Sequence, residues 1–294
     1  MPRTFRFIVN PIAGPGDNQS FWRSLKKVLL QNGINFKKKS TKRQGHASNW
    51  TDKRVKKGTN SVIVSVGGDG TFNEVASSLI HTGLLMAHIP RGSGNGLARM
   101  LKIPVKLNQI PPYLKDGVPV EIDSGVMNGK AFFCTAGFGF DALIAHHFSE
   151  SKTRGLKSYV WYTIKTFFSY KGVNADFTLD GEKISGTFFT VTIANANQYG
   201  NNAFIAPMAD LQDGLLDVTM IRPFSKWITP ILVPALFGKW IHKFTFVETR
   251  KIKRMEIHSL SSPYFHRDGE ADQNELPVEV QVIPGSLQLL VPGK

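Results

Sequence analysis

Three short loops that carry glycines each follow a compact apolar run early in the chain. They are Asn10–Gly14 after Phe5–Val9, Gly67–Thr71 after Ser61–Val66, and Arg91–Asn95 after Met86–Pro90. The middle run is rich in valine and isoleucine, as in parallel strands that are buried on both faces. Because parallel strands end at the same edge of a sheet, we expect the three loops to converge at that edge, where open α/β folds bind ligands.

The loop Gly67–Thr71 has the features of a phosphate-binding turn. Glycines let the backbone approach a phosphate, and a helix starting there offers N–H groups and the positive end of its dipole. Thr71 and Glu74 also match a capping box. A tight turn would explain the glycines equally well, but not Asp69, because an acid repels phosphate unless a cation or a proton transfer uses it. No Gly-x-x-x-x-Gly-Lys-Ser/Thr motif is present, which argues against P-loop chemistry.

The pattern changes to β-rich sequence from about residue 118. Asn128-Gly129 and Asp180-Gly181 predict hairpin turns. Strands are expected at Thr187–Ile193, Leu216–Ile221, Phe244–Val247, Val278–Ile283 and Leu287–Val291, with a helical segment from Asp141 to about Ser169. The sequence therefore predicts an α/β, Rossmann-like nucleotide domain over residues 1–120. A β-sandwich domain is expected over 121–294, with the last residues able to pack back on the first domain.

The charge of the chain limits its partners. Lys and Arg number 36 against 22 Asp and Glu, a formal net charge of +14. This excess favours an anionic partner: a nucleic acid, a phosphate-bearing substrate or an acidic membrane. The basic segments Arg23–Lys57 and Lys239–Arg254 fit either a solvated face or contact with anionic lipid. No nucleic-acid-binding motif is evident, so we expect no nucleic acid partner.

The apolar segments and the cysteine content indicate the compartment. Trp227–Phe237 contains two prolines and is shorter than the roughly 20 residues that a spanning helix needs. Aromatic and proline residues in Pro223–Trp240 fit either a membrane interface or the core. The single cysteine, Cys134, excludes an intramolecular disulfide and a Cys-rich zinc site. We expect a cytoplasmic protein, soluble or peripheral at the inner face of the membrane.

Taken in order, the motifs resemble the catalytic domain of the diacylglycerol kinase and sphingosine kinase family. The set is Asn10–Gly14, Thr41 with Gly45-His46-Ala47, Gly67–Glu74, Pro90–Arg99, Gly137–Ala142, Ala206-Pro207, Asp213–Val218 and Asp268-Gly269-Glu270. It spans nearly the whole chain, whereas the glycine–aspartate motif alone also occurs in NAD kinases and phosphofructokinases. The resemblance implies an ATP-dependent lipid kinase, built from an NAD kinase-like α/β domain and a β-sandwich, with its active site in the cleft between them.

The resemblance also implies roles for individual residues. ATP would be held by Asn10, Pro11, Ile12, Ala13, Gly14, Thr41, Gly67, Gly68, Asp69, Gly70, Thr71, Phe72, Asn73, Ser93 and Asn95. The implied catalytic acids are Asp69, Asp268 and Glu270, and either Asp69 or Glu270 would be the general base. Mg²⁺ would bind Asp213, with backbone carbonyls near Asp210 and Leu215. Asp141 lies near the acid that orients the head group in sphingosine kinases.

Ordinary structural roles remain open for these acids. Asp213-Gly214 and Asp268-Gly269 are also typical turns, which would leave Glu270 solvated, and Asp141 fits a helix N-cap. Nevertheless, phosphoryl transfer needs Mg²⁺ and an acid–base group, and carboxylates are suitable for both.

Two departures leave the lipid open. Gly92–Gly96 is more similar to sphingosine and ceramide kinases, and Pro15 stands where relatives often have a basic residue. We expect diacylglycerol or a related glycerolipid, with a sphingoid base or ceramide as the alternative. A soluble NAD kinase-like enzyme and a non-enzymatic anion binder are alternatives from other classes. The oligomeric state stays open, a homodimer being one option.

Overall fold

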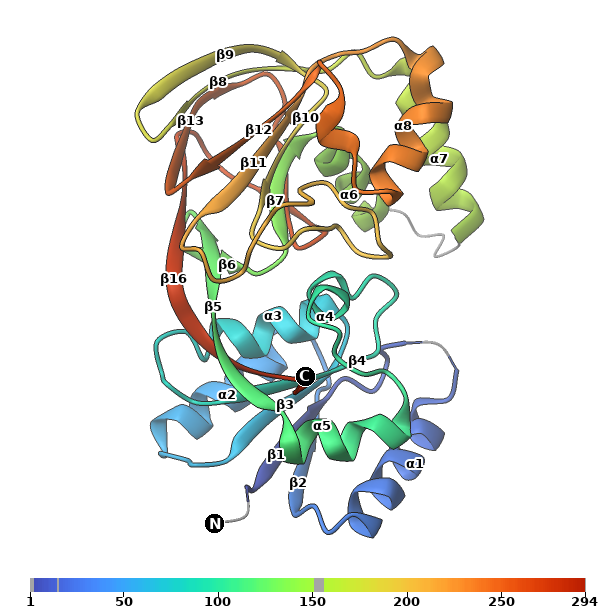
Figure 1. The fold of residues 1–294 in the computed structure, drawn as a ribbon, viewed down its shortest axis with the longest axis vertical. Coiled ribbons are helices and arrows are strands. Elements are labelled where there is room, and N and C mark those ends of the chain that lie inside the picture. Colours follow the sequence, from blue (N-terminus) through green and yellow to red (C-terminus); the bar gives the residue numbers. More distant parts are fainter. Residues whose placement is uncertain (1–2, 15, 151–155, 294) are drawn as a thin grey trace. The chain divides into compact units, whose positions relative to one another are not determined.

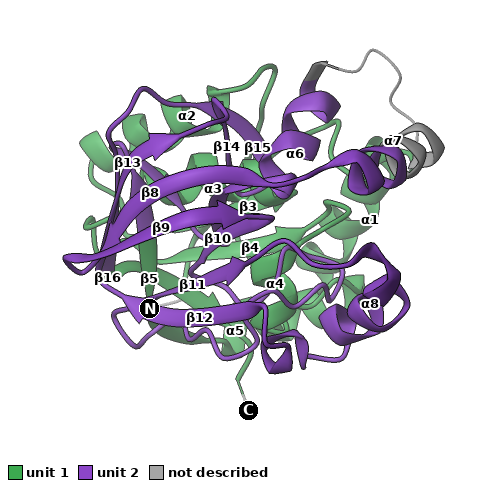
Figure 2. Ribbon diagram, turned by 90° about the horizontal axis from the view of Figure 1, so that it is seen from above, with its two compact units in different colours: residues 1–124, 284–294 green, residues 125–283 purple. Residues whose placement is uncertain are grey.

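The computed structural model describes residues 3–14, 16–150 and 156–293. The chain divides into two compact units (Figure 2). Unit 1 comprises Met1–Ser124 and Pro284–Lys294, and unit 2 comprises Gly125–Ile283. Two strands, β5 (Val118–Met127) and β16 (Val278–Val291), contain the points where the chain passes from one unit to the other. None of the described helices is long and apolar enough to span a bilayer.

Unit 1 is built on a parallel sheet with the strand order β2-β1-β3-β4 (Figure 1). The strands are β1 (Phe5–Val9), β2 (Phe36–Ser40), β3 (Val62–Gly67) and β4 (Met86–Pro90). The helices are α1 (Asn18–Gln31), α2 (His46–Lys56), α3 (Asp69–Ser77), α4 (Gly96–Met100) and α5 (Ile110–Asp116), with a 3₁₀ turn, η1 (Leu107–Gln109). All residues of β3 are buried, as its apolar sequence predicts.

Local sequence signals set the bounds of α1. The Asp17 carboxylate accepts the backbone N–H groups of Gln19 and Ser20, so it caps the start of the helix. Gly33 follows the end of the helix with φ +66°, a conformation that glycine adopts at little cost. Leu25 and Leu29 then lie on the buried face, which joins this helix to the core of unit 1.

Unit 2 contains a six-stranded antiparallel sheet in the order β12-β11-β10-β7-β14-β15. Its strands are β7 (Thr135–Gly139), β10 (Thr190–Ala194), β11 (Leu216–Ile221), β12 (Val247–Ile252), β14 (Tyr264–Arg267) and β15 (Glu270–Gln273). A second set consists of β6 (Lys130–Phe132), β8 (Val173–Leu179), β9 (Glu182–Phe188) and β13 (Arg254–Leu260), paired with parts of β5 and β16. Buried side chains of both sets form one core, which includes Phe138 and Phe177 with ring centroids 6.1 Å apart. The predicted α/β plus β-sandwich class is confirmed.

The predicted hairpins are confirmed, but three element assignments differ. Asn128-Gly129 joins β5 to β6 and Asp180-Gly181 joins β8 to β9, each with two positive φ values. The expected strand Thr187–Ile193 is interrupted at Phe189, between β9 and β10. The two strands expected after residue 278 are one continuous strand, β16.

The third difference concerns Phe244–Val247, where β12 begins only at Val247. The preceding residues follow a 3₁₀ turn, η3 (Ile241–Lys243), and the Phe246 ring lies 5.0 Å from that of Phe224. Aromatic packing therefore replaces strand pairing here. The predicted helical segment is observed as α6 (Phe140–Glu150) and α7 (Leu156–Ser169), and residues 151–155 lie outside the described part of the chain.

The capping box expected from Thr71 and Glu74 is wrong. Helix α3 begins at Asp69 with Gly68 as its N-cap, so Thr71 is already inside the helix. The Glu74 carboxylate instead accepts the N–H groups of Gly45 and Ala47, both at 2.9 Å. Since no local side chain caps α2, Glu74 accepts the N–H groups that would otherwise lack partners at the start of that helix.

Candidate active site

The three glycine loops of unit 1 are in direct contact, as their placement after adjacent parallel strands predicts. A Cβ atom on Gly92 would lie 2.7 Å from the Cα of Gly68, and one on Gly14 would collide with the carbonyl oxygen of Arg91. Any larger side chain at Gly14 or Gly92 would therefore force the loops apart. The glycines are required for close backbone approach between loops, in addition to leaving room for a ligand.

Side-chain hydrogen bonds join the loops. The Asn10 amide donates to the Thr71 hydroxyl at 3.1 Å, which links the first loop to the second. The backbone N–H of Asn95 donates to the Asp69 carboxylate at 2.9 Å, which links the third loop to the second. Asp69 is also the first residue of α3, where the helix dipole stabilises a negative charge. This carboxylate therefore holds the third loop as well as standing in the predicted catalytic position.

The remaining predicted ATP-binding residues differ in exposure. Thr41 is buried directly after β2, and its N–H bonds to the Val9 carbonyl at 2.8 Å. Phe72 is buried, with its ring nearly perpendicular to that of His88, so its side chain does not line the loops. Burial of His88 lowers its pKa to about 3. Exposed side chains at the loops include Ile12 and Ser93, which suits contact with a ligand.

Arg91 is a residue of this region to which sequence reasoning gave no role. Its guanidinium lies 4.0 Å from the centre of the Phe21 ring and donates to the Asn18 side chain at 3.0 Å. Burial lowers the pKa of Arg91. The side chain lies beside Gly14, close in sequence to Pro15, where relatives often have a basic residue. A basic residue in a loop that is predicted to bind phosphate is the sequence feature that would have indicated a role for Arg91.

In unit 2, Asp268 anchors the turn that carries Glu270. Asp268 and Gly269 have φ values of +47° and +80° and join β14 to β15, so the hairpin turn considered from the sequence is present. The Asp268 carboxylate accepts the N–H groups of Phe133, Cys134 and Thr135 at 3.0, 2.7 and 3.2 Å. Asp268 thereby fixes the start of β15, and Glu270 begins that strand with an exposed side chain.

Asp141 is the centre of a buried polar cluster in unit 2. Its carboxylate accepts hydrogen bonds from the hydroxyls of Thr190, Thr192 and Tyr199 at 2.7, 3.0 and 2.8 Å, and lies 3.1 Å from His266 Nε2. Burial alone would raise the pKa of Asp141, but the charge of His266 and these hydrogen bonds lower it below its ordinary value. The carboxylate also accepts the Ala142 N–H of its own helix at 2.8 Å. The N-cap alternative nevertheless misses the main role of this side chain, because its other partners come from β10, β14 and the loop after β10.

The predicted magnesium ligand Asp213 is paired with a lysine. Lys251 donates to one oxygen of Asp213 at 2.6 Å and to Asp217 at 3.0 Å, and the Leu215 N–H bonds to the other Asp213 oxygen at 3.0 Å. The Asp210 carboxylate accepts the Gln212 N–H at 3.0 Å. The described residues contain no group of three or more acidic, His or Cys side chains that would hold a metal. An ion at Asp213 would depend on backbone carbonyls and would have to displace the Lys251 ammonium.

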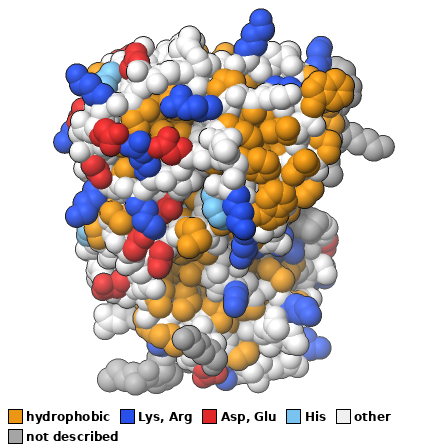
Figure 3. All heavy atoms as spheres, turned by 45° about the horizontal axis from the view of Figure 1, so that its top comes forward, with side chains coloured by type: hydrophobic (Ala, Val, Ile, Leu, Met, Phe, Trp, Pro, Cys, Tyr) orange, Lys and Arg blue, Asp and Glu red, His pale blue; other side chains and the backbone are white. Residues whose placement is uncertain are grey.

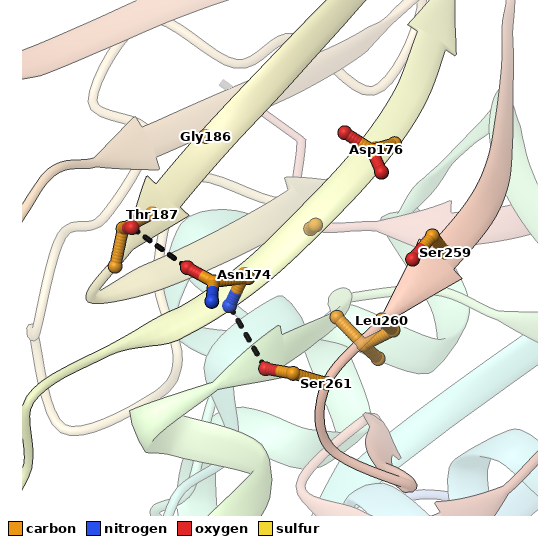
Figure 4. A pocket seen from close by; sticks show the side chains of 8 residues that line it. Asn174, Asp176, Gly186, Thr187, Ser259, Leu260 and Ser261 are labelled. Carbon is orange, nitrogen blue, oxygen red and sulfur yellow. Dashed lines mark hydrogen bonds between the residues drawn. The ribbon is translucent and has the colours of Figure 1, made fainter.

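Two surface hollows in unit 2 differ in their relation to these residues. One lies beside the Asp213 loop and is lined by Pro207, Asp217 and Lys251 among others. The other is a shallow groove over β8, β9 and β13 (Figure 4). Its Asn174 is already bonded to Ser261 and Thr187 at 2.9 and 2.7 Å, and it contains none of the predicted site residues.

Known protein families match sequence from both units. Residues 4–127 match the family described as the diacylglycerol kinase catalytic domain, and residues 134–291 match the YegS C-terminal NAD kinase beta sandwich-like domain. This chain belongs to the diacylglycerol kinase family. A Mycobacterium tuberculosis protein named diacylglycerol kinase is 30% identical over 246 residues, which cover 81% of this chain and 79% of that protein. A Yersinia enterocolitica protein named "Probable lipid kinase YegS-like" is 26% identical over 99% of this chain and 98% of its own length.

The fold is also that of solved structures. A diacylglycerol kinase from Bacillus anthracis superimposes with a TM-score of 0.74 over 98% of this chain and 97% of that one, at 20% identity. The sequence matches therefore identify the chain as a lipid kinase, and the structural match shows that it has the fold of this family. The match over residues 4–127 contains the three glycine loops, and the match over 134–291 contains Asp141, Asp213 and Glu270.

Proposed function

We propose that this kinase transfers the γ-phosphoryl group of ATP to the hydroxyl of a neutral glycerolipid, diacylglycerol or a close relative. The observation that carries the proposal is the set of three glycine loops tied together through Asp69 and Asn95 at one sheet edge. Such loops can surround phosphates with backbone N–H groups, and the start of α3 adds its positive dipole end. The name of the Mycobacterium relative supports the choice of diacylglycerol.

Two carboxylates are the proposed acid–base groups. Phosphoryl transfer depends mainly on positioning and on neutralising charge, and a base takes the proton of the attacking hydroxyl. We propose that Asp69 or Glu270 accepts this proton. Asp268 is proposed to hold the turn before Glu270. Mg²⁺, when bound, would neutralise phosphate charge, and Asp213 is its proposed ligand, with backbone carbonyls near Asp210 and Leu215.

The proposed reaction is tested by a phosphorylation screen over lipid classes in mixed micelles. We expect radiolabel from ATP to appear in an organic-extractable product of diacylglycerol, and chelation of Mg²⁺ by EDTA to abolish the transfer. Label that enters only a water-soluble acceptor such as NAD would replace the lipid kinase proposal by an NAD kinase-like one. The absence of any transfer would favour an anion binder.

The hydrogen bonds that the Asp141 carboxylate already accepts within the protein support an uncharged lipid as the phosphoryl acceptor. A sphingoid base carries an ammonium group beside its hydroxyl, and a carboxylate is the natural partner for that charge. Thr190, Thr192, Tyr199 and His266 already occupy the Asp141 carboxylate within the protein. An ammonium would have to displace these buried donors, which would then lack partners at a cost of about 1–3 kcal/mol each.

This reasoning predicts the lipid selectivity of Asp141→Ala. We expect the wild type to prefer diacylglycerol over sphingosine by more than about tenfold, which corresponds to 1.4 kcal/mol. Asp141→Ala should lower the free energy of unfolding by at least about 2 kcal/mol, because several buried donors lose their acceptor. The selectivity ratio of the folded variant should stay within about threefold. A wild type active only on the sphingoid base, with that activity lost in Asp141→Ala, would reverse the assignment.

Arg91 is proposed to supply the phosphate contact that Pro15 lacks. Arg91→Gln should raise the KM for ATP about tenfold, as expected for one charge-assisted hydrogen bond, and should change kcat less. Arg91→Lys retains the charge and should recover part of the affinity. Initial rates at varied ATP concentration measure both. An unchanged KM in Arg91→Gln would limit this side chain to packing against Phe21 and bonding Asn18.

The basic segments are proposed to attract the kinase to an anionic membrane face. Binding to vesicles should rise with their anionic lipid content and fall from low to high salt, because salt screens exposed charges. Co-sedimentation with vesicles measures this. Equal binding to neutral and anionic vesicles at low salt would show that Arg23–Lys57 is only a solvated face.

A further inference from the structure

An exposed apolar area lies on α7 and α8 of unit 2, with η2 (Lys226–Ile228) directly before α8 (Thr229–Phe237). We call it the α8 surface and define it by Trp227, Ile231, Val233 and Phe237 with Ile164 and Phe168 of α7. Trp227 is 92% exposed, and the other five side chains are 48–64% exposed. Figure 3 shows hydrophobic side chains gathered at the upper right of the view, with Lys and Arg around them. Exposed apolar side chains gathered in this way on a protein surface indicate an interaction site.

We propose that the α8 surface is a membrane-docking surface that inserts its apolar side chains into an anionic lipid bilayer. The inference goes beyond the proposed phosphoryl transfer and does not depend on it. It concerns a part of unit 2 that would contact the bilayer itself rather than a single lipid substrate molecule.

The sequence of α8 lacks the polar face of an ordinary surface helix. After Thr229 the helix contains no polar or charged side chain. Leu232 and Leu236 pack inward on the core cluster that includes Phe189 and Phe224, so one face is satisfied within the protein. The opposite face, with Ile231 and Phe237, is also apolar but exposed. Water is an unfavourable environment for such a face, and the apolar boundary of a bilayer is a favourable one.

Charge favours anionic lipid as the occupant. The stretch 218–247 contains no Asp or Glu but carries the exposed Arg222, Lys239 and Lys243, and the stretch 156–175 is also free of acids. A second copy of this surface would bring these like charges together, which opposes a symmetric dimer through it. An anionic leaflet complements them, at about 1 kcal/mol per Lys or Arg near the surface. Trp227 is of the residue type that is enriched at membrane–water interfaces.

The α8 surface is held in place before any lipid binds. The Lys226 ammonium lies 4.1, 4.4 and 4.9 Å from the ring centres of Phe189, Phe167 and Phe224. These contacts attach η2 to α7 and to the core, and burial lowers the pKa of Lys226. Trp240 stacks on Phe244 with centroids 5.7 Å apart directly after α8. Binding therefore does not require a disordered segment to fold.

The test compares two triple variants. The first is Trp227→Ser with Ile231→Ser and Phe237→Ser, and the matched control is Leu30→Ser with Val105→Ser and Val118→Ser. The control residues are exposed by 59, 62 and 49% and lie in unit 1. Because all six side chains are exposed, both variants should keep the wild-type thermal unfolding midpoint within a few degrees, and this is measured first.

Binding is measured by co-sedimentation with sucrose-loaded vesicles of phosphatidylcholine with phosphatidylglycerol. We expect the α8 variant to lose at least about tenfold in partition coefficient, and the control less than about twofold, because only the first removes inserted apolar area. Brominated lipids should quench wild-type tryptophan fluorescence more than that of Trp227→Phe. Equal losses in both variants, no loss in the α8 variant, or loss only of a self-associated form in sedimentation velocity would overturn the proposal.

Activity separates this inference from the proposed reaction. The α8 variant should phosphorylate a short-chain, monomerically dispersed diacylglycerol at the wild-type rate, and lose activity only on vesicle-embedded substrate. A protein that binds vesicles through the α8 surface but phosphorylates no lipid would disprove the proposed reaction and leave the docking surface intact.

Discussion

Asp69→Asn is expected to lower kcat by at least about a hundredfold, the lower end of general acid–base contributions. The asparagine retains an oxygen that can accept the Asn95 N–H, so the link between the second and third loops can persist. Nucleotide binding and thermal stability should therefore stay close to those of the wild type. Steady-state rates, ATP titration calorimetry and a thermal melt measure the three quantities.

Asp52→Asn is the matched control for this charge change. Asp52 is an exposed acid on α2, and it has no proposed part in the reaction. It should leave kcat within about twofold of the wild type, as expected for a surface substitution. Retention of more than about a tenth of wild-type kcat in Asp69→Asn would show that this carboxylate serves only to hold the loops.

Glu270→Gln is expected to reduce kcat to a comparable extent, with little change in the KM for ATP. The turn before Glu270 depends on Asp268 and its bonds to the N–H groups of Phe133, Cys134 and Thr135, and the substitution leaves these unchanged. The loss would therefore report on the carboxylate itself. Initial rates at varied ATP and lipid separate kcat from the two KM values.

Glu275→Gln is the control, since Glu275 is exposed shortly after β15 and has no proposed role. If Glu270→Gln changes only the KM for ATP, Glu270 is a binding residue and Asp69 carries the proton transfer alone. If neither parameter changes, Glu270 is a solvated residue of an ordinary hairpin.

Much of the fold follows from local sequence features. The α/β and β-sandwich halves and the hairpins were predictable because strand patterns, helix spacing and turn residues act over a few neighbouring positions. Convergence of the glycine loops was predictable for a related reason: parallel strands end at one edge, and β1, β3 and β4 are neighbours. The roles proposed for Asp69 and Glu270 also begin with sequence motifs, and they remain predictions.

The partners of the polar side chains were decided only by the tertiary structure. Glu74 accepts N–H groups of α2 rather than of its own helix, and Lys251 pairs with Asp213. Asp141, on helix α6, is surrounded by donors from β10, β14 and the loop after β10. Asp268 bonds to Phe133, which is 135 positions away. A single sequence contains the residue types but no information on which distant groups meet. Because a buried carboxylate must find donors wherever the fold brings them, its partners follow from packing.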